Sequence, residues 1–495
     1  MSKNKTMAIL LSATLVLGGC IGEQEKPETN VKATEKKTTQ NIEERTEITG
    51  ETTEDNYTEG QDISEEYPNE PKEDTDEYVG EESDDNFIYS IYEKHAEIKE
   101  FIGKARRELT IPDEYNKLPV TIIDEFACNN NKSLTKLTIG SNVEKIGGTS
   151  FYDNEMLLSV NFKNPEIIKC IGASAFNGCE LLSDFPSILP NLETIGNSAF
   201  YGTAIKEFTV PSRVEKIEES SFESCKKLKK IIIEDGVTAI GNSVFKNTGL
   251  ESIIVPDSVT EMGSKIFEGC NDLKEATIGR GLKILGGVFE NCNALEKVTL
   301  SEGLEDILYN AFYNCSSLKQ IEIPKSVKRL SSSDDVGTNI GTFVGCDSLE
   351  KVILHEGLEE IGDYAFAGIA STPSFNKIPL SSIVIPNTVN TIGYMAFAGL
   401  KNIKEITIPG NVVIISGDAF AECNALEKVI INEGVIQIDY DAFEWCDNLS
   451  FVSLPDSLVQ IDSRAFSRDE NVKVHYKNNV YTYDNLEELY NLING

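Results

Sequence analysis

Phenylalanine recurs along this 495-residue chain at a nearly fixed interval, and this period constrains the fold more than any other feature. The recurring residues are Phe126, Phe151, Phe176, Phe200, Phe222, Phe245, Phe267, Phe289, Phe312, Phe343, Phe366, Phe397, Phe420, Phe443 and Phe466. Successive intervals are 25, 25, 24, 22, 23, 22, 22, 23, 31, 23, 31, 23, 23 and 23 residues. A period of about 20 to 30 residues indicates a solenoid, in which one small unit stacks on its copies.

The residues around each phenylalanine follow a common pattern, close to L-x-x-I-x-I-P-x-x-V-x-x-I-G-x-x-A-F-x-x-C. The alternation in L-x-x-I-x-I predicts a short strand, and the proline or glycine that follows it predicts a turn. V-x-x-I-G predicts a second extended segment, and A-F begins a tight irregular or helical return. One unit cannot bury these apolar residues alone, but stacked copies can. The sequence therefore predicts a β-rich solenoid with short parallel strands and a shared column of phenylalanine rings.

The first 19 residues predict a signal peptide. Lys3 and Lys5 precede an apolar run from Met7 to Leu17, which is shorter than the roughly 20 apolar residues of a membrane-spanning helix. The sequence Leu17-Gly18-Gly19-Cys20 resembles a lipobox, the processing site of prokaryotic lipoproteins. This resemblance implies that lipid on Cys20 anchors the protein to a membrane of the cell envelope, facing outside the cytoplasm. The alternative is an ordinary secretory peptide with an incidental cysteine.

Residues 20–86 are predicted to form a disordered acidic tether after the lipid-modified Cys20. Between Ile21 and Asn86 there are 23 acidic and 6 basic residues, and the whole chain has a formal net charge of -36. A segment with so few large apolar residues cannot offset its ordering entropy by burial. The alternative is an acidic tail that binds metal or protein. The overall charge argues against a nucleic-acid partner, whose phosphates would repel it.

At residues 109–475 the repeat pattern resembles that of the BspA-type bacterial leucine-rich repeat surface proteins. The resemblance rests on I-G-x-x-A-F-x-x-C-x-x-L-x-x-I-x-I-P and on the opening Leu109-Thr110-Ile111-Pro112. It implies a leucine-rich repeat array of about 15 units of 22–25 residues over 109–471, and a role in adhesion to host, matrix or neighbouring-cell proteins. Because the ends of a solenoid need covers, we expect an N-terminal cap at 87–108 and a C-terminal cap at 472–495. The latter should contain a last strand at Val472–Tyr476 and a short helix at Asn485–Ile493.

Most cysteines are expected to be buried free thiols. Eight of the eleven lie three residues after a column phenylalanine, and Asn129, Asn154, Thr203 or Thr248 takes this position in other copies. Stacked parallel side chains keep their Cβ atoms about 4.8 Å apart, beyond the usual disulfide range. Some bridges between adjacent units remain an alternative, and Cys128 and Cys170 lie outside this series. The eight are Cys179, Cys225, Cys270, Cys292, Cys315, Cys346, Cys423 and Cys446.

The sequence predicts no catalytic residues, no metal ligands and no cofactor. The only histidines are His95, His355 and His475, and no two share a repeat position. Neither a histidine metal cluster nor a Cys–His pair is therefore indicated. An enclosed pair of acidic residues, as in glycosidases, is a weak alternative because a flat solenoid rarely supplies the desolvated pocket it needs.

The first candidate binding surface is a column of residues that should point outward from the L-x-x-I-x-I strands. A column of Lys, Glu, Ser and Gln lies beside it. β-Branched residues fit pleated strands without any ligand, but an apolar sheet face several units long also suits a protein partner. The candidate residues are Ile232, Ile254, Thr277, Thr299, Ile353, Val384, Thr407 and Ile430.

The second candidate is formed by the two 31-residue intervals. Ser331 to Gly341 lengthens the segment before Phe343, and Ala370 to Pro379 lengthens the segment after Phe366. Insertions in one repeat map to loops that often carry recognition, although loops also drift at little thermodynamic cost. The candidate residues are Ser331, Asp334, Asp335, Asn339, Ser374 and Asn376.

These features predict a lipid-anchored adhesin or capture protein whose array binds a protein ligand. The alternative is an envelope protein with a structural or self-association role and no host ligand. The sequence does not indicate an oligomeric state.

Overall fold

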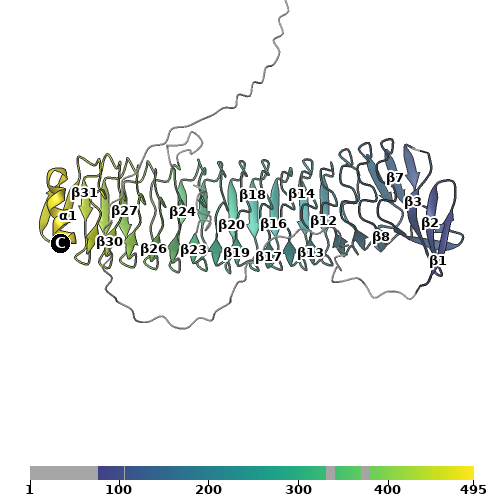
Figure 1. Cartoon of the computed structure of the whole chain (residues 1–495), viewed down its shortest axis with the longest axis horizontal. Coiled ribbons are helices and arrows are strands. Elements are labelled where there is room, and N and C mark those ends of the chain that lie inside the picture. The colour runs from purple at the N-terminus through teal and green to yellow at the C-terminus, as the bar shows by residue number, and fades with distance from the viewer. Residues whose placement is uncertain (1–75, 105, 331–340, 369–377) are drawn as a thin grey trace, which may run out of the picture. The chain divides into compact units, whose positions relative to one another are not determined.

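The computed structural model describes residues 76–104, 106–330, 341–368 and 378–495. They form a β-solenoid of about 16 turns with parallel strands and little helix. Figure 1 shows the turns lying side by side in chain order. The expected solenoid of stacked repeats is therefore confirmed.

Each regular turn carries one longer strand, which pairs in parallel with the same strand of a neighbouring turn. These strands divide into sheets β4-β7-β9, β12-β14, β16-β18-β20, β22-β24 and β27-β29-β31-β33-β34. Their bounds are β4 (Glu108–Thr110), β7 (Lys136–Ile139), β9 (Ser159–Phe162), β12 (Glu207–Val210), β14 (Lys230–Ile233), β16 (Ser252–Val255), β18 (Glu275–Ile278), β20 (Lys297–Leu300), β22 (Gln320–Glu322), β24 (Lys351–Ile353), β27 (Glu405–Ile408), β29 (Lys428–Ile431), β31 (Phe451–Ser453), β33 (Lys473–Tyr476) and the antiparallel β34 (Asn479–Thr482).

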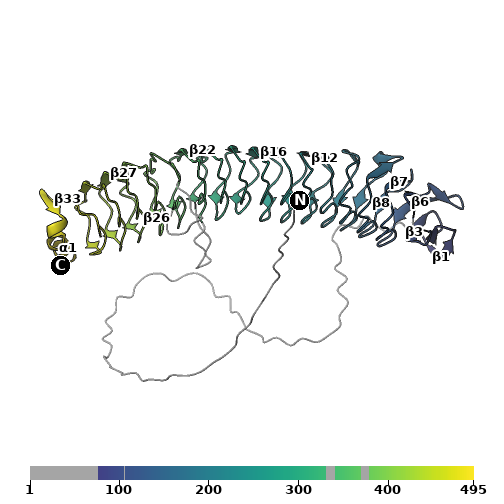
Figure 2. The same cartoon turned by 90° about the horizontal axis from the view of Figure 1, so that it is seen from above.

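The V-x-x-I-G segments form a second parallel ladder on another side of each turn. In Figure 2, β8 and β26 of this ladder lie along one long edge, and β12, β16 and β22 lie along the other. The bounds are β6 (Leu118–Ile123), β8 (Lys145–Ile146), β10 (Cys170–Ile171), β11 (Thr194–Ile195), β13 (Lys216–Ile217), β15 (Ala239–Ile240), β17 (Glu261–Met262), β19 (Ile284–Leu285), β21 (Asp306–Ile307), β23 (Arg329–Leu330), β25 (Glu360–Ile361), β26 (Thr391–Ile392), β28 (Ile414–Ile415), β30 (Gln437–Ile438) and β32 (Gln460–Ile461). The glycine after the isoleucine is needed because turns approach closely here. A Cβ on Gly196 would lie 2.4 Å from the backbone nitrogen of Ala173.

Fourteen of the recurring phenylalanines form one continuous column of stacked, buried rings. Between Phe151 and Phe466, neighbouring ring centroids lie 5.0 to 5.8 Å apart, with interplanar angles of 4° to 21°. Tight turns rather than helices carry these rings. Around Phe245, for example, Ser243 and Asn247 take left-handed backbone conformations with φ of 54° and 56°.

The first phenylalanine of the series does not belong to this column, which corrects the prediction. Phe126 is 59% exposed and left-handed at φ 58°, whereas Cys128 is buried. Ile123 pairs with Ile146, so Cys128 follows it by the same five residues that separate Ile146 from Phe151. Cys128 therefore occupies the ring position, and the position assigned to Asn129 belongs to the buried Asn131.

The N-terminal end is covered by an antiparallel sheet that begins earlier than the expected cap at 87–108. Strand β1 (Tyr78–Ser83) falls within the segment 20–86 that was predicted to be disordered. It pairs with β2 (Phe87–Tyr92), which pairs with β3 (Ala96–Phe101). The ring of Tyr78 packs edge-on against Tyr92 at 5.6 Å. β3 joins the solenoid by pairing in parallel with β6, which also pairs with β5 (Glu114–Tyr115).

At the C-terminal end, β33 lies where the last strand was expected. It forms a hairpin with β34, followed by the 3₁₀ helix η2 (Tyr483–Asn485) and helix α1 (Leu486–Asn494). Helix α1 buries Leu486, Leu489 and Tyr490. It is the only α-helix among the described residues, and the other 3₁₀ helix there is η1 (Pro165–Ile167).

Candidate protein-binding surface

The eight candidate residues on the longer strands form the outward column that we call the strand-face column. In β14, Ile231 and Ile233 are buried while Ile232 is 43% exposed, because successive side chains alternate across a strand. Ile254 is 69% exposed and Val384 is 80% exposed. Thr299 and Thr407 are also exposed, and Thr277, Ile353 and Ile430 are partly exposed. The predicted outward orientation of this column thus agrees with the side-chain exposure.

Strand register brings several column residues together. Ile254 is the partner of Thr277, and Thr277 of Thr299. Thr407 is the partner of Ile430. The column also has two irregular positions, of which the sequence pattern already indicated the first. Glu322 stands opposite Ile353, and Val384 lies outside any strand.

Lysine and glutamate beside the column pair across neighbouring turns. Lys404 Nζ lies 3.2 Å from Glu427 Oε1, and Lys428 Nζ lies 3.8 Å from Glu405 Oε2. Lys229 Nζ lies 3.6 Å from Glu251 Oε1 on the neighbouring turn and 2.6 Å from Asp272 Oδ2 two turns on, and these acidic partners, Asp272 first, raise the pKa of Lys229. Exposed pairs of this kind contribute little stability. Their effect is to keep the flank of the column close to neutral in a strongly acidic chain.

The candidate insertion residues lie outside the described residues, so the structure places none of them. They are Ser331, Asp334, Asp335, Asn339, Ser374 and Asn376. Cys20 lies outside the described residues as well.

The eight repeated cysteines are buried, and none of the cysteines in the described ranges forms a disulfide. Burial raises the pKa of the Cys270 thiol to about 11 and that of Cys225 to about 12. Thiols of this kind stay protonated at neutral pH and are poor nucleophiles. Cys170, in β10, is only partly buried. These cysteines serve the core rather than a reactive site.

The three histidines lie in separate parts of the array. His95 Nδ1 is 2.6 Å from Asp76 Oδ2 near the N-terminal sheet, and His355 Nε2 is 2.9 Å from Glu322 Oε1 in mid-array. The His475 ring packs against Phe451 with centroids 4.5 Å apart. No two of them are brought together.

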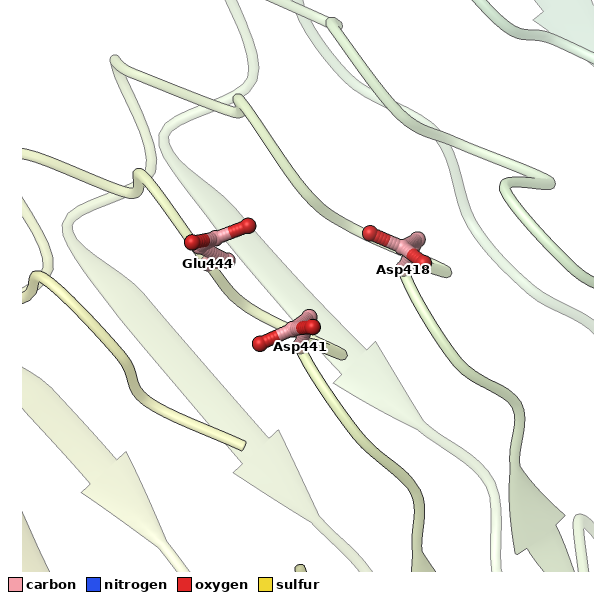
Figure 3. Close-up of side chains that lie close together, drawn as sticks. All are labelled: Asp418, Asp441 and Glu444. Atoms are coloured by element: carbon pink, nitrogen blue, oxygen red, sulfur yellow. The ribbon is translucent and has the colours of Figure 1, made fainter. Parts of the chain in front are cut away.

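One carboxylate cluster was missed by sequence reasoning. Asp418, Asp441 and Glu444 each offer an oxygen atom within 4.8 Å of the others, and Figure 3 shows them on two adjacent turns. Burial, together with the negative charges of Asp441 and Glu444, raises the pKa of Asp418. The signal was present in the sequence, because Asp418 and Asp441 each stand two residues before a column phenylalanine.

Arginines of the last repeat already neutralise part of this cluster. Arg464 Nη1 lies 3.1 Å from Asp441 Oδ2, and Arg468 Nε lies 3.3 Å from Glu444 Oε1. The guanidinium groups also lie over the rings of Tyr440 and Trp445, at 5.2 and 4.5 Å from the centroids. We therefore interpret the cluster as a charge-paired surface and assign no ion to it.

Known proteins resemble the chain along most of its length. A family model described as a BspA type leucine rich repeat region (6 copies) matches residues 99–229, 216–334, 338–376 and 368–486. A leucine-rich repeat protein from Bacteroides ovatus has a similar solved structure, with 24% identity and a TM-score of 0.58, over 80% of this chain and 99% of that chain. A leucine-rich cell surface protein from Faecalibacterium prausnitzii shows 22% identity and a TM-score of 0.44, over 77% and 96%. No curated protein matches the sequence. Within the described ranges, no helix is long and apolar enough to cross a membrane.

Proposed function

The chain belongs to the BspA-type leucine-rich repeat family, and from this premise we propose that it is a cell-surface adhesin whose strand-face column binds a protein ligand. The observation that carries the proposal is the exposure of aliphatic side chains along this column, above all Ile254 and Val384. Exposed aliphatic residues that gather on one surface and are bordered by polar residues are typical of interaction sites. From Ile232 to Ile430 the column crosses nine turns, a length of about 40 Å at the usual strand spacing.

The charge balance around the column supports the same proposal. Lysine and glutamate alternate between turns and pair with each other, so a partner meets little net charge at the flanks. A protein interface typically has few charged residues at its core and a polar rim. A protein ligand with an exposed apolar strip is therefore the partner class that fits.

The proposal includes a lipid anchor on Cys20, because Leu17-Gly18-Gly19-Cys20 resembles a lipobox. The acidic segment after Cys20 would then separate the array from the membrane. This arrangement would place the protein in the cell envelope with its array outside the cytoplasm.

The binding proposal is tested with the full chain carrying Ile254→Lys and Val384→Lys. Binding to immobilised extracellular-matrix proteins and to envelopes of the producing cell is compared with that of the unmodified protein. Lysine on these exposed positions should leave folding intact but abolish binding, since it places unpaired charge in the apolar contact. Val459→Lys is the matched control, because Val459 is 62% exposed beside the second ladder. Equal loss of binding in the control, or full binding by the double variant, would contradict the assignment.

A second candidate function is self-association in the envelope. The alternating charges favour it, because a lysine of one copy can face a glutamate of another. Sedimentation of the purified chain at increasing concentration distinguishes the two functions. Self-association that Ile254→Lys abolishes, without any binding to matrix proteins, would favour this second function.

The insertions remain a proposed second contact region. Deletion of residues 332–339 returns the interval from Phe312 to Phe343 from 31 to 23 residues, which is the common spacing. Loss of binding on this deletion, with the strand-face column intact, would place the ligand at the insertion.

A further inference from the structure

The last repeat carries an aspartate where eight earlier repeats carry a cysteine. Asp469 follows Phe466 by three residues, as Cys446 follows Phe443. Its side chain is buried, with only 1% of the residue exposed. A buried ionised carboxylate is costly unless it is paired and fully hydrogen-bonded. Asp469 therefore needs a partner for each of its two oxygen atoms.

Only one of these oxygen atoms has a partner in the described part of the chain. Oδ1 accepts a hydrogen bond from the backbone N–H of Cys446 at 2.9 Å. Oδ2 is buried and has none.

Asn154 takes the same position near the other end of the array and shows what this position requires. Its Oδ1 accepts a hydrogen bond from the backbone N–H of Asn131 at 2.7 Å, just as Asp469 accepts from Cys446. Its Nδ2 donates to the carbonyl oxygens of Cys128 and Phe151, at 3.1 and 2.9 Å. The cysteines at this position likewise donate to a backbone carbonyl, as Cys446 does to Phe420 at 3.3 Å. The second polar atom is thus a donor, and a carboxyl group donates only when protonated.

The charged and titratable groups around Asp469 also favour the protonated form. The preceding turn contributes Glu444, Asp447 and the thiol of Cys446, and helix α1 contributes Tyr490. Burial, and then the negative charges of Asp447 and Glu444, raise the pKa of Asp469 to about 8 against the hydrogen bond from Cys446. Arg468, which directly precedes Asp469, forms an ion pair with Glu444, and its guanidinium group lies over the Trp445 ring.

We propose that Asp469 holds the last repeat and the α1 cap in place as a neutral carboxylic acid whose Oδ2 donates a hydrogen bond, and that loss of this proton loosens the C-terminal end of the array. At its own position, Asn154 donates N–H groups to two backbone carbonyl oxygens. By this analogy, an ionised Oδ2 of Asp469 would face the corresponding carbonyl oxygens of the last two turns with no proton to donate. Tyr490 links the cap to this event, because it is buried in α1, and the charge of Asp469 adds to burial in raising the pKa of its phenol.

The direction of the pH effect follows from proton binding. The unfolded aspartate has an ordinary pKa of about 4, so the folded chain binds the extra proton between that value and about pH 8. The stability of this end is therefore greatest at low pH, falls as pH rises through about 8, and is constant above that value.

The test uses Trp445, the only tryptophan of the chain, as a built-in probe of the last two turns. The urea midpoint of its fluorescence change is measured on the full chain from about pH 5, above the ordinary pKa of aspartate, to about pH 9, above the raised pKa of Asp469. The midpoint of the unmodified protein should fall across this range by more than that of Asp469→Asn. At the upper pH, Asp469→Asn should be the more stable of the two, because its amide donates at every pH. Asp469→Cys, which restores the usual residue, should also flatten the profile.

Two further variants complete the test. Glu470→Gln removes an exposed adjacent carboxylate and should keep the pH profile of the unmodified protein. Asn154→Asp should create the same pH sensitivity near the N-terminal end of the array. Hydrogen exchange of the Asn131 amide, expressed relative to the unmodified chain at the same pH, should be faster at pH 9 than at pH 5. Parallel profiles for the unmodified protein and Asp469→Asn, or a lower midpoint for Asp469→Asn at the upper pH, would overturn the proposal.

Discussion

The thiol of Cys225 donates a hydrogen bond to the backbone carbonyl of Phe200, which lies 3.0 Å away in the preceding repeat. The seven other cysteines of the series make the same bond, at 3.0 to 3.3 Å. These carbonyls belong to buried residues, and a buried acceptor without a partner costs free energy. Cysteine is small and apolar, yet it offers a weak donor, so it fits a column that must also satisfy a backbone group.

Substitution of one such cysteine should show this dual role. Cys225→Ala removes the donor and a buried atom, and we expect the free energy of unfolding to fall by about 1 to 3 kcal/mol. Cys225→Thr should cost less, because Thr203 and Thr248 occupy the same position in their own repeats. Urea denaturation followed by circular dichroism measures both. Cys170→Ala, on a partly exposed residue, is the control, and a cost as large as that of Cys225→Ala would contradict this explanation.

The burial of the thiols also predicts their chemical reactivity. In a chain carrying Cys20→Ser, iodoacetamide at about pH 8 should modify Cys170 first, because it is the one partly exposed thiol among the described cysteines, although burial raises its pKa as well. Cys225 and Cys270 have raised pKa values and no solvent access, so their modification should require unfolding. Mass spectrometry of peptides from the native and the denatured chain gives the order of labelling. Equal rates at Cys225 and Cys170 in the native chain would refute the burial of the series.

The phenylalanine column offers a matched pair of substitutions within one chain. Phe267 is fully buried between Phe245 and Phe289, with centroids 5.6 and 5.4 Å away. Phe267→Ala should lower the free energy of unfolding by about 3 to 5 kcal/mol, the usual cost of such a cavity. Phe126→Ala should change it by less than about 0.5 kcal/mol, because that ring is exposed. If Phe126→Ala lowered the free energy of unfolding as much as Phe267→Ala, the assignment of Phe126 to the surface would be wrong.

The proposed lipid anchor predicts a change of location. Cys20→Ser should release the protein from the membrane fraction of the producing cell and abolish incorporation of a fatty-acid label. One residue carrying several acyl chains gives durable anchoring, since each buried methylene contributes about 0.8 kcal/mol. Replacement of both Lys3 and Lys5 by serine is a useful comparison, because it weakens export without altering Cys20. Continued membrane retention of Cys20→Ser would exclude lipid on this residue as the anchor.

The solenoid could be predicted because the same pattern recurs in every repeat, so a deviation in one copy does not change the prediction for the array. The prediction was wrong where a single copy departs from the pattern. Phe126 was aligned by its identity, whereas the distance from Ile123 assigns the ring position to Cys128. Spacing from the preceding strand is therefore a better guide than the residue type.

Features that depend on contacts between distant or neighbouring turns were harder to infer. Strand β1 has no buried residue and lies in an acidic stretch, so no hydrophobic alternation in the sequence indicated that it pairs with β2. The carboxylate cluster combines Asp418 with Asp441 and Glu444, and their proximity follows from stacking rather than from any local motif. The exposed column was predictable because alternation along a strand fixes which residues face outward.

In the strand ladders, the backbone of each turn pairs only with the turns beside it, and a few side-chain bonds such as Lys229 to Asp272 reach two turns. A gene that gains or loses one whole unit would therefore leave the backbone pairing between the remaining neighbours unchanged. The reach of such a protein can then be altered by duplication or deletion alone, while the residues at its two ends keep the same neighbours.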